Sequence, residues 1–173
     1  MGVILLAGIY GVGKSTLGEA LSQRQGIPFY SAGDLISHVN GETYGANKAV
    51  ADKVGNQDIL AMQIERLLEQ NDRILLAGHF CIINKHGEVD RLPRDAFKNL
   101  HLDRIILLEA EERQIMDHLC ARDAKKYSPE LVAALMKTER EMAYEVSTEL
   151  NCPIMTHCMT YSPADILTIE RAL

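Results

Sequence analysis

Short runs of aliphatic residues alternate along the chain with longer stretches whose apolar positions recur at helical spacing. An unbroken apolar run of about four to eight residues is typical of a strand that is buried on both faces of a sheet. Such runs predict five strands, at residues 3–7, 28–31, 73–78, 104–108 and 154–157. Strands that alternate with helices favour a mostly parallel sheet with helices on both faces, which is a three-layer α/β fold.

Capping residues indicate where several of the helices begin or end. A helix is expected over residues 14–25, with Gly26 as its C-cap. Serine followed by proline predicts helix starts at Ser128 and Ser162, because serine caps an N-terminus and proline fits the first helical turn. Further helices are expected from Gly33 onward, over 57–70, and over 111–122, where acidic residues occupy the first turn.

Two segments in the second half of the chain have a more specific pattern. Residues 80–90 predict a β-hairpin that turns at His86-Gly87. The long helix after Ser128 is expected to present one apolar face, made of Leu131, Leu135, Met142, Val146 and Leu150.

The composition is that of an ordinary globular domain and narrows the classes of partner. Apolar residues make up 47% and charged residues 24%, without repeats or linkers, so residues 1–173 are expected to form a single domain. The net charge of −6 argues against a broad electrostatic grip on nucleic acid or on an anionic membrane. The apolar run at 3–7 is too short for a signal-peptide core, and no stretch approaches the ~20 apolar residues of a membrane helix. A cytoplasmic location is therefore expected.

The four cysteines are scattered at long spacings and are expected to be reduced thiols. Cys152, His157 and Cys158 are close in sequence but lack the paired ligand spacing of zinc sites. No metal centre is expected there.

The most specific motif is Gly8-Ile9-Tyr10-Gly11-Val12-Gly13-Lys14-Ser15, followed by Thr16. It fits the Gly-x-x-x-x-Gly-Lys-Ser/Thr pattern and lies between a predicted strand and a predicted helix, which is the setting this pattern requires. Glycines let successive N–H groups turn toward phosphate oxygens, and the helix N-terminus adds partial positive charge. Lys14 is expected to neutralise the outer phosphates and Ser15 to ligate Mg2+. The motif predicts binding of a nucleoside triphosphate.

Candidate groups for the rest of a phosphotransfer site follow later in the chain. Asp34 comes directly after the second strand, at the edge where open α/β sheets place ligands. The sequence leaves open whether Asp34 orients an acceptor, joins a metal shell or caps a helix. Arg122 ends a helix within a cationic cluster and is expected to stabilise a transferring phosphoryl group. The roles of the neighbouring Lys125 and Lys126 remain open.

These residues together resemble the adenylate kinase superfamily, and most closely archaeal-type adenylate kinases and the related small nuclear adenylate kinase/ATPase of eukaryotes. The resemblance is carried by the phosphate loop through Leu17 and by residues 31–35, 78–93 and 105–122. It implies a P-loop NTPase fold with an acceptor-binding segment at about residues 31–56 and a short lid at about 122–129. It also implies ATP- and Mg2+-dependent phosphoryl transfer to a nucleoside monophosphate or a similar small acceptor.

The resemblance assigns roles to individual residues of this chain. The expected ATP-binding set is Gly11, Val12, Gly13, Lys14, Ser15, Thr16 and Arg122. Lys14, Arg122 and His79 are the expected catalytic residues. For His79, the sequence leaves open a structural imidazole or a place near the γ-phosphate or an attacking water.

The chain departs from the family pattern at two places. Relatives end the third strand with Asp-x-His, whose aspartate holds magnesium through water, whereas this strand ends Ala77-Gly78-His79. The acceptor segment also lacks the arginine expected to grip a monophosphate, and Lys48 is its nearest cation. Asp34 and Lys48 are therefore the acceptor-binding candidates. For magnesium there remain Ser15, the phosphates and water, or a carboxylate borrowed from Asp34 or Glu109.

Two functions from different classes follow. The first is an adenylate-type kinase that uses ATP and Mg2+ and takes a small-molecule nucleotide as its acceptor. The alternative is a slow ATPase or a nucleotide-dependent interaction module with a protein partner, which the missing aspartate and arginine would permit. A kinase for nucleic-acid ends is disfavoured, because the acidic balance offers no track for a polynucleotide.

Overall fold

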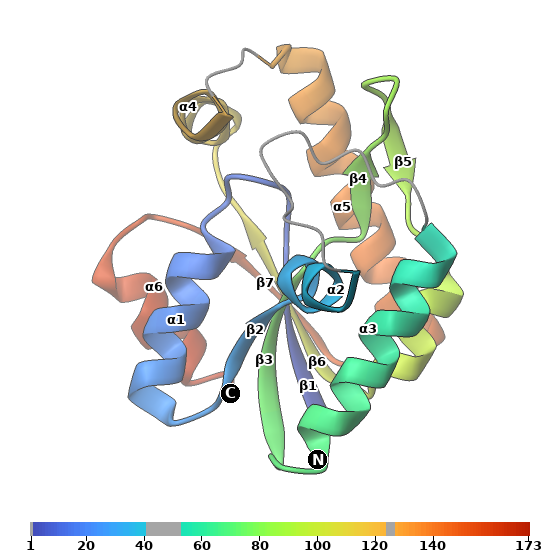
Figure 1. The fold of residues 1–173 in the computed structure, drawn as a ribbon. Helices are drawn as coiled ribbons and strands as arrows, with labels where there is room; N and C mark the ends of the chain where they lie inside the picture. The colour runs from blue at the N-terminus through green and yellow to red at the C-terminus, as the bar shows by residue number, and fades with distance from the viewer. Residues whose placement is uncertain (1, 41–52, 124–126) are drawn as a thin grey trace.

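A five-stranded parallel sheet forms the centre of the computed structural model, which describes residues 2–40, 53–123 and 127–173 (Figure 1). The strand order is β2–β3–β1–β6–β7. The strands are β1 (Gly2–Ala7), β2 (Phe29–Ser31), β3 (Arg73–Gly78), β6 (Leu102–Glu109) and β7 (Ile154–Cys158). All five predicted strands are confirmed, each to within two residues at either end. β1 is buried along its whole length because it lies in the middle of the sheet, between β3 and β6.

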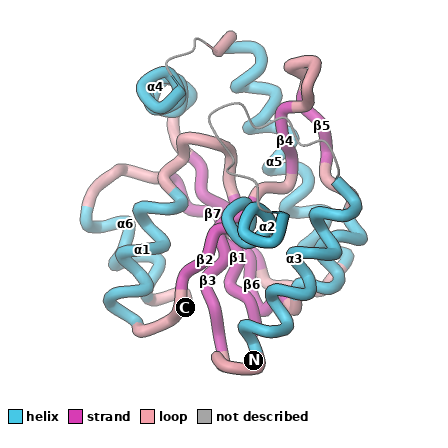
Figure 2. The backbone as a smooth tube through the Cα atoms, viewed as in Figure 1, coloured by secondary structure: helices cyan, strands magenta, loops and turns pink. Residues whose placement is uncertain are grey.

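Helices cover both faces of this sheet, as the alternating pattern predicts (Figures 1 and 2). On one face, α1 (Lys14–Gln25) packs beside α6 (Pro163–Glu170). On the other face lie α3 (Lys53–Leu68) and α5 (Pro129–Glu149). Buried apolar side chains from the sheet and from these helices form one hydrophobic core. The three-layer α/β fold of the P-loop kinases is thereby confirmed.

The shorter elements lie at the ends of the sheet. Helix α2 (Ala32–Asn40) follows β2, and α4 (Glu112–Asp123) follows β6. The hairpin of β4 (Cys81–Ile83) and β5 (Val89–Arg91) turns at His86-Gly87, as predicted, with Gly87 at a φ of 81°. A 3-10 helix, η1 (Arg94–Leu100), leads from this hairpin into β6. In the part of the chain that the structure describes, no helix is long and apolar enough to cross a membrane.

The helix ends follow the capping predictions. Gly26 ends α1 in the left-handed conformation, with a φ of 67°. The Ser128 side chain accepts a hydrogen bond from the backbone N–H of Leu131 at the start of α5. Ser162 and Asp165 form a reciprocal capping box at the start of α6. Local side-chain chemistry therefore determines these boundaries.

The buried face of α5 differs from the predicted one. Leu135, Met142 and Val146 are buried as expected, whereas Leu131 and Leu150 are only half-buried. The buried face also includes Val132, Ala143 and the charged residue Glu139. The sheet contacts a stripe that is rotated slightly from the predicted one, and an acidic residue lies at its centre.

Candidate functional site

One cavity of about 800 Å³ lies where the carboxyl ends of the parallel strands meet the phosphate loop. This edge of an open parallel sheet is where ligands bind in α/β folds. One side of the cavity is lined by the loop itself and by residues of α4 and of the β7–α6 connection. The other side is lined by residues that follow β2, β3 and β5 and by the start of α3. The cavity therefore offers adjoining space for two molecules.

Three glycines shape the phosphate loop. Gly8, Gly11 and Gly13 have φ angles of 144°, 79° and 99°, which residues with a side chain rarely adopt. A Cβ at Gly8 would lie 2.6 Å from the carbonyl oxygen of Leu108 and 2.9 Å from the Val12 side chain. The loop can follow this path only with glycine at that position. Val12 itself is fully buried, so its side chain supports the loop rather than lining the cavity.

Lys14 folds back over the beginning of this loop. Its Nζ donates hydrogen bonds to the carbonyl oxygens of Gly8, at 2.6 Å, and of Ile9, at 2.9 Å. The ammonium group is 3.4 Å from Nδ1 of His79, which lies just beyond the end of β3. Ser15 and Thr16 follow in the first turn of α1, where both are exposed and line the cavity. The structure thus brings Lys14, His79 and Ser15 to one wall.

The Tyr10 ring lies between the side chains of His79 and Arg122. No role was assigned to Tyr10 from the sequence. The Tyr10 and His79 ring centroids are 4.2 Å apart, and the Arg122 guanidinium carbon lies 5.7 Å from the Tyr10 centroid. Burial raises the pKa of the Tyr10 hydroxyl well above its usual range, and the nearby Cys81 and Glu139 act in the same direction. Tyr10 therefore remains a neutral aromatic wall between the two predicted catalytic side chains.

Arg122 lines the cavity from the end of α4. Its guanidinium makes two hydrogen bonds with the Asp123 carboxylate, at 2.5 and 2.6 Å, and the Tyr127 hydroxyl donates to the same carboxylate. This pairing with Asp123 raises the pKa of Arg122 above its ordinary value, so the group stays charged. Residues 124–126 of the predicted lid, including Lys125 and Lys126, lie outside the described residues.

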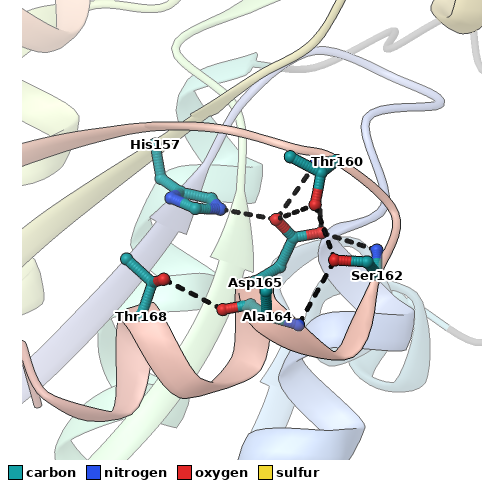
Figure 3. A network of polar contacts seen from close by, with 6 residues as sticks. All are labelled: His157, Thr160, Ser162, Ala164, Asp165 and Thr168. Atoms are coloured by element: carbon teal, nitrogen blue, oxygen red, sulfur yellow. Dashed lines mark hydrogen bonds and ion pairs between the residues drawn. The ribbon is translucent and has the colours of Figure 1, made fainter.

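The connection between β7 and α6 lines the cavity beside the loop. A network of polar contacts holds this connection (Figure 3). Asp165 is 2% exposed and accepts hydrogen bonds from the Thr160 N–H and hydroxyl and from the Ser162 N–H. Nε2 of His157 lies 2.9 Å from the same carboxylate. Burial alone would raise the pKa of Asp165, but these hydrogen bonds outweigh it and hold that pKa below its usual value. The network fixes the backbone that carries Tyr161.

Tyr161 and His118 form the outer wall on this side. Their rings pack edge to face with centroids 4.7 Å apart, and Nδ1 of His118 lies 2.9 Å from the carbonyl oxygen of Gly11. Tyr161 has a φ of 56°, in the left-handed region. An aromatic wall beside a phosphate loop suits the flat face of a nucleobase.

The acceptor side of the cavity is more apolar. Its described lining includes small and polar residues, namely Ser31, Ala32, Gly33, Asn56 and Gln57, and Asn56 is 6% exposed. The apolar part of that lining consists of Ile36, Leu60, Ile82, Leu92, Phe97 and Leu100. A substrate on this side would contact mainly apolar side chains.

The two predicted acceptor residues do not appear in this described lining. Asp34 is exposed in the first turn of α2, and its N–H donates to the Ser31 hydroxyl at 3.4 Å. Ser31 therefore caps this helix, and Asp34 lies where its charge favours the helix dipole. Lys48 lies outside the described residues.

Among the described residues, the Ser15 hydroxyl lines the cavity beside the loop and is chemically suited to bind magnesium directly. Glu109 pairs with Arg140, its two oxygens each 2.6 Å from a guanidinium nitrogen, and lines a separate cavity of about 380 Å³. The carboxylate of Asp165 is engaged in the network described above. Magnesium retains several waters and binds substrate phosphates readily, so Ser15, phosphate oxygens and water form a chemically suitable set.

Glu139 is another site residue that the sequence interpretation missed, in addition to Tyr10, His118 and Tyr161. Its side chain is buried against the phosphate loop and accepts hydrogen bonds from backbone N–H groups, including that of Gly8 at 3.0 Å. A signal was present, because residues 132, 135, 139, 142 and 146 follow the helical spacing of a buried face. A glutamate within such a stripe indicates a paired carboxylate.

Comparisons with known proteins match this architecture. A family model described as AAA domain matches residues 7–135. An adenylate kinase of Corynebacterium aurimucosum is 27% identical over 148 residues, which cover 81% of each chain. A shikimate kinase of Xanthomonas oryzae pv. oryzae is 22% identical over 160 residues, which cover 85% of this chain and 88% of the relative.

A solved structure supports the same fold. A gluconokinase from Sinorhizobium meliloti superposes with a TM-score of 0.59 at 18% identity, over 99% of this chain and 90% of its own. The resemblance to the adenylate kinase superfamily is confirmed, and the similarity extends to other small-molecule kinases. Since the matched family model covers residues 7–135, which include the phosphate loop, His79 and Arg122, this chain belongs to the AAA domain family.

Proposed function

We propose that this protein transfers the γ-phosphoryl group of ATP to a small-molecule acceptor, with a nucleoside monophosphate as the first candidate. The observation that carries the proposal is the continuity of one cavity from the phosphate loop, past His79, to Ser31, Asn56 and Gln57. A donor and an acceptor bound at its two ends would meet beside Lys14. Such shared enclosure is what direct transfer between two bound molecules requires.

The donor end is built to bind the triphosphate. The loop N–H groups and the N-terminus of α1 provide positive partial charge. Lys14 would exchange the carbonyl oxygens of Gly8 and Ile9, which it contacts in this structure, for phosphate oxygens. Bound magnesium would neutralise phosphate charge, with Ser15 as its protein ligand. The nucleobase would lie against Tyr161 and His118.

At the acceptor end, an acceptor oxygen attacks the γ-phosphorus as the bond from phosphorus to the bridging oxygen of ADP breaks. Lys14 and Arg122 stabilise the charge that spreads over the transferring group. In this proposal, His79 accepts a proton from an acceptor hydroxyl or orients a phosphate acceptor. Because the described lining is mainly apolar, the acceptor's ring or carbon skeleton would occupy this end.

A specific observation also favours the alternative of a slow ATPase or nucleotide-dependent interaction module. Ala77 is the next-to-last residue of β3 and lines the cavity, at the position where the resemblance to adenylate kinases implies an aspartate that holds magnesium through water. Loss of one such outer-shell partner typically costs about 10- to 100-fold in metal affinity or activity. Transfer would then be slow, and nucleotide binding would be the main event.

The test is ADP formation from ATP and Mg2+ across a panel of acceptors. The panel contains nucleoside monophosphates, nucleosides, shikimate and gluconate. Shikimate and gluconate are included because similar proteins are named shikimate kinase and gluconokinase. We expect at least one acceptor to raise the rate about tenfold or more over ATP alone. Calorimetry measures ATP affinity in parallel.

Lys14→Ala is the control variant. It should weaken ATP binding and abolish transfer, because the ammonium group at the beginning of the loop would be lost. Slow turnover that no acceptor stimulates, together with tight ATP binding, would support the ATPase alternative over the kinase. Unchanged ATP affinity in Lys14→Ala would contradict the assignment of the loop itself.

A further inference from the structure

The buried carboxylate of Glu139 connects two strand ends at the candidate site. Glu139 lies in the middle of α5, is 1% exposed, and is flanked on its helix face by Leu135 and Met142. Its Oε1 accepts a hydrogen bond from the Gly8 N–H at 3.0 Å. Its Oε2 accepts from the N–H groups of Phe80 at 2.8 Å and Cys81 at 2.9 Å.

The partners of this carboxylate flank the catalytic candidates. Gly8 opens the phosphate loop, and its carbonyl oxygen accepts the hydrogen bond from Lys14. Phe80 and Cys81 immediately follow His79, whose Nδ1 lies 3.4 Å from the Lys14 ammonium. One side chain therefore holds the turn that precedes Lys14 and the turn that follows His79.

The chemistry of this position favours a carboxylate over its amide. All three partners are N–H donors, and an ionised carboxylate has only acceptors, whereas an amide would turn an NH2 group toward at least one of them. Burial raises the pKa of Glu139, while the charge of Lys14 and the Phe80 and Cys81 N–H groups act in the opposite direction. A buried charge is tolerated when it is paired and fully hydrogen-bonded in this way.

We propose that Glu139 is a positioning residue for phosphoryl transfer, which holds the phosphate loop and the His79 turn in one fixed geometry. It lines neither the donor nor the acceptor side of the 800 Å³ cavity and reaches the site through the backbone N–H groups of Gly8, Phe80 and Cys81. The inference rests on the proposed function. It adds that the distance between Lys14 and His79 is controlled from the far side of the loop, by α5.

The variant Glu139→Gln keeps the size of the side chain and removes its charge. We expect kcat to fall by about 10- to 100-fold, since small misplacements of reacting groups have effects of that order. The Kd for ATP should change by less than about threefold, because the loop N–H groups and Lys14 remain present. Amide NMR resonances of Gly8, Phe80 and Cys81 should shift, since their hydrogen bonds lose a charged acceptor.

The adjacent Arg140→Gln is the matched control. Arg140 also joins α5 to a strand end, through Glu109 of β6, but its side chain is 60% exposed and contacts neither turn. We expect its kcat to stay within about twofold of the wild type, as for other exposed ion pairs. Folded Glu139→Gln with wild-type kcat would overturn the inference, and so would an equal loss in Arg140→Gln.

Glu139→Asp covers the case in which Glu139→Gln does not fold. Aspartate keeps the charge but has a shorter reach, so the same three amide resonances should shift and kcat should fall. Wild-type kcat in the folded Asp variant, with those resonances shifted, would overturn the inference. If the wild-type protein binds ATP but transfers phosphate to no acceptor, both the proposed function and this inference are overturned. If the wild-type protein transfers phosphate and Glu139→Gln transfers it at the same rate, only this inference is overturned.

Discussion

At the scale of single residues, Tyr10 shows how a variable position of the phosphate loop can organise its neighbours. Its ring lies between the His79 imidazole and the Arg122 guanidinium, both of which line the cavity. Cation–π and aromatic contacts of this kind are each worth about 0.5–1.5 kcal/mol. Tyr10 therefore helps to hold two polar side chains close to the loop.

Replacing this ring should separate aromatic packing from the hydroxyl group. We expect Tyr10→Leu to lower kcat/KM for ATP by about five- to tenfold, corresponding to roughly 1 kcal/mol of lost ring contacts. Tyr10→Phe is the matched control and should stay near the wild type, because it retains the ring. Steady-state kinetics with the best acceptor measures both. Equal losses in the two variants would assign the effect to the hydroxyl instead.

Ala77 is the second residue whose change is informative. It is 6% exposed and lines the same cavity as Ser15. We expect Ala77→Asp to raise Mg2+-dependent turnover by about tenfold, because a carboxylate there would hold the waters of bound magnesium. Turnover measured against Mg2+ concentration gives the effect.

The control for this change is Ala77→Asn, which has the same shape without the charge. It should leave turnover near that of the wild type. If Ala77→Asp brings no gain in Mg2+ affinity or in turnover, another group already serves the metal in this protein.

At the scale of elements, the connection from β7 to α6 is held by one carboxylate. The network around Asp165 joins His157 of β7 to Thr160 and to the Ser162 cap of α6 (Figure 3). We expect Asp165→Asn to destabilise the protein at pH 7 by about 1–3 kcal/mol, because its amide would leave buried donors unpaired. Urea unfolding measures this difference.

The pH dependence of that difference has a definite sign. The folded-state pKa of Asp165 is lowered, so its stabilisation is fully present above the unfolded value of about 4. It is lost as the pH falls through the lower folded-state value. The difference in the free energy of unfolding between wild type and Asp165→Asn should therefore become smaller below about pH 4.

Thr168→Ala is the control on the same helix. The Thr168 hydroxyl donates to the Ala164 carbonyl oxygen at an exposed position, and it does not titrate. Its removal should have a small effect that does not change with pH. A gap for Asp165→Asn that persists unchanged into acid would contradict the role assigned to the ionised carboxylate.

At the scale of the whole molecule, the strand order creates the site. β1 lies between β3 and β6, so the turns that follow these strands meet above the centre of the sheet. Lys14 follows the turn after β1, and His79 lies in the turn after β3. Arg122 lies at the end of α4, the helix that follows β6. Residues more than forty positions apart in the chain thus become neighbours, since parallel strands place their carboxyl ends at one edge.

Much of this arrangement could be predicted from the residues, because it depends on local rules. The buried strands, the β4–β5 turn at Gly87 and the serine caps of α5 and α6 follow from hydrophobic runs and capping chemistry. The phosphate loop is equally local, since its glycines and Lys14 are contiguous. The least local prediction, Asp34 as an acceptor or metal group, depended on where a helix would start, and Ser31 provides the cap there instead.

The sequence by itself determined the secondary structure, the α/β class and the phosphate loop, because each depends on neighbours within a few positions. Only the tertiary structure decided that Tyr10 lies between His79 and Arg122 and that Glu139 binds the backbone of two distant turns. Those contacts join residues up to 131 positions apart, and the pairing of one buried carboxylate with its donors is settled only when the strands and α5 have packed. The identity of the partners of a buried charge is therefore a property of the fold.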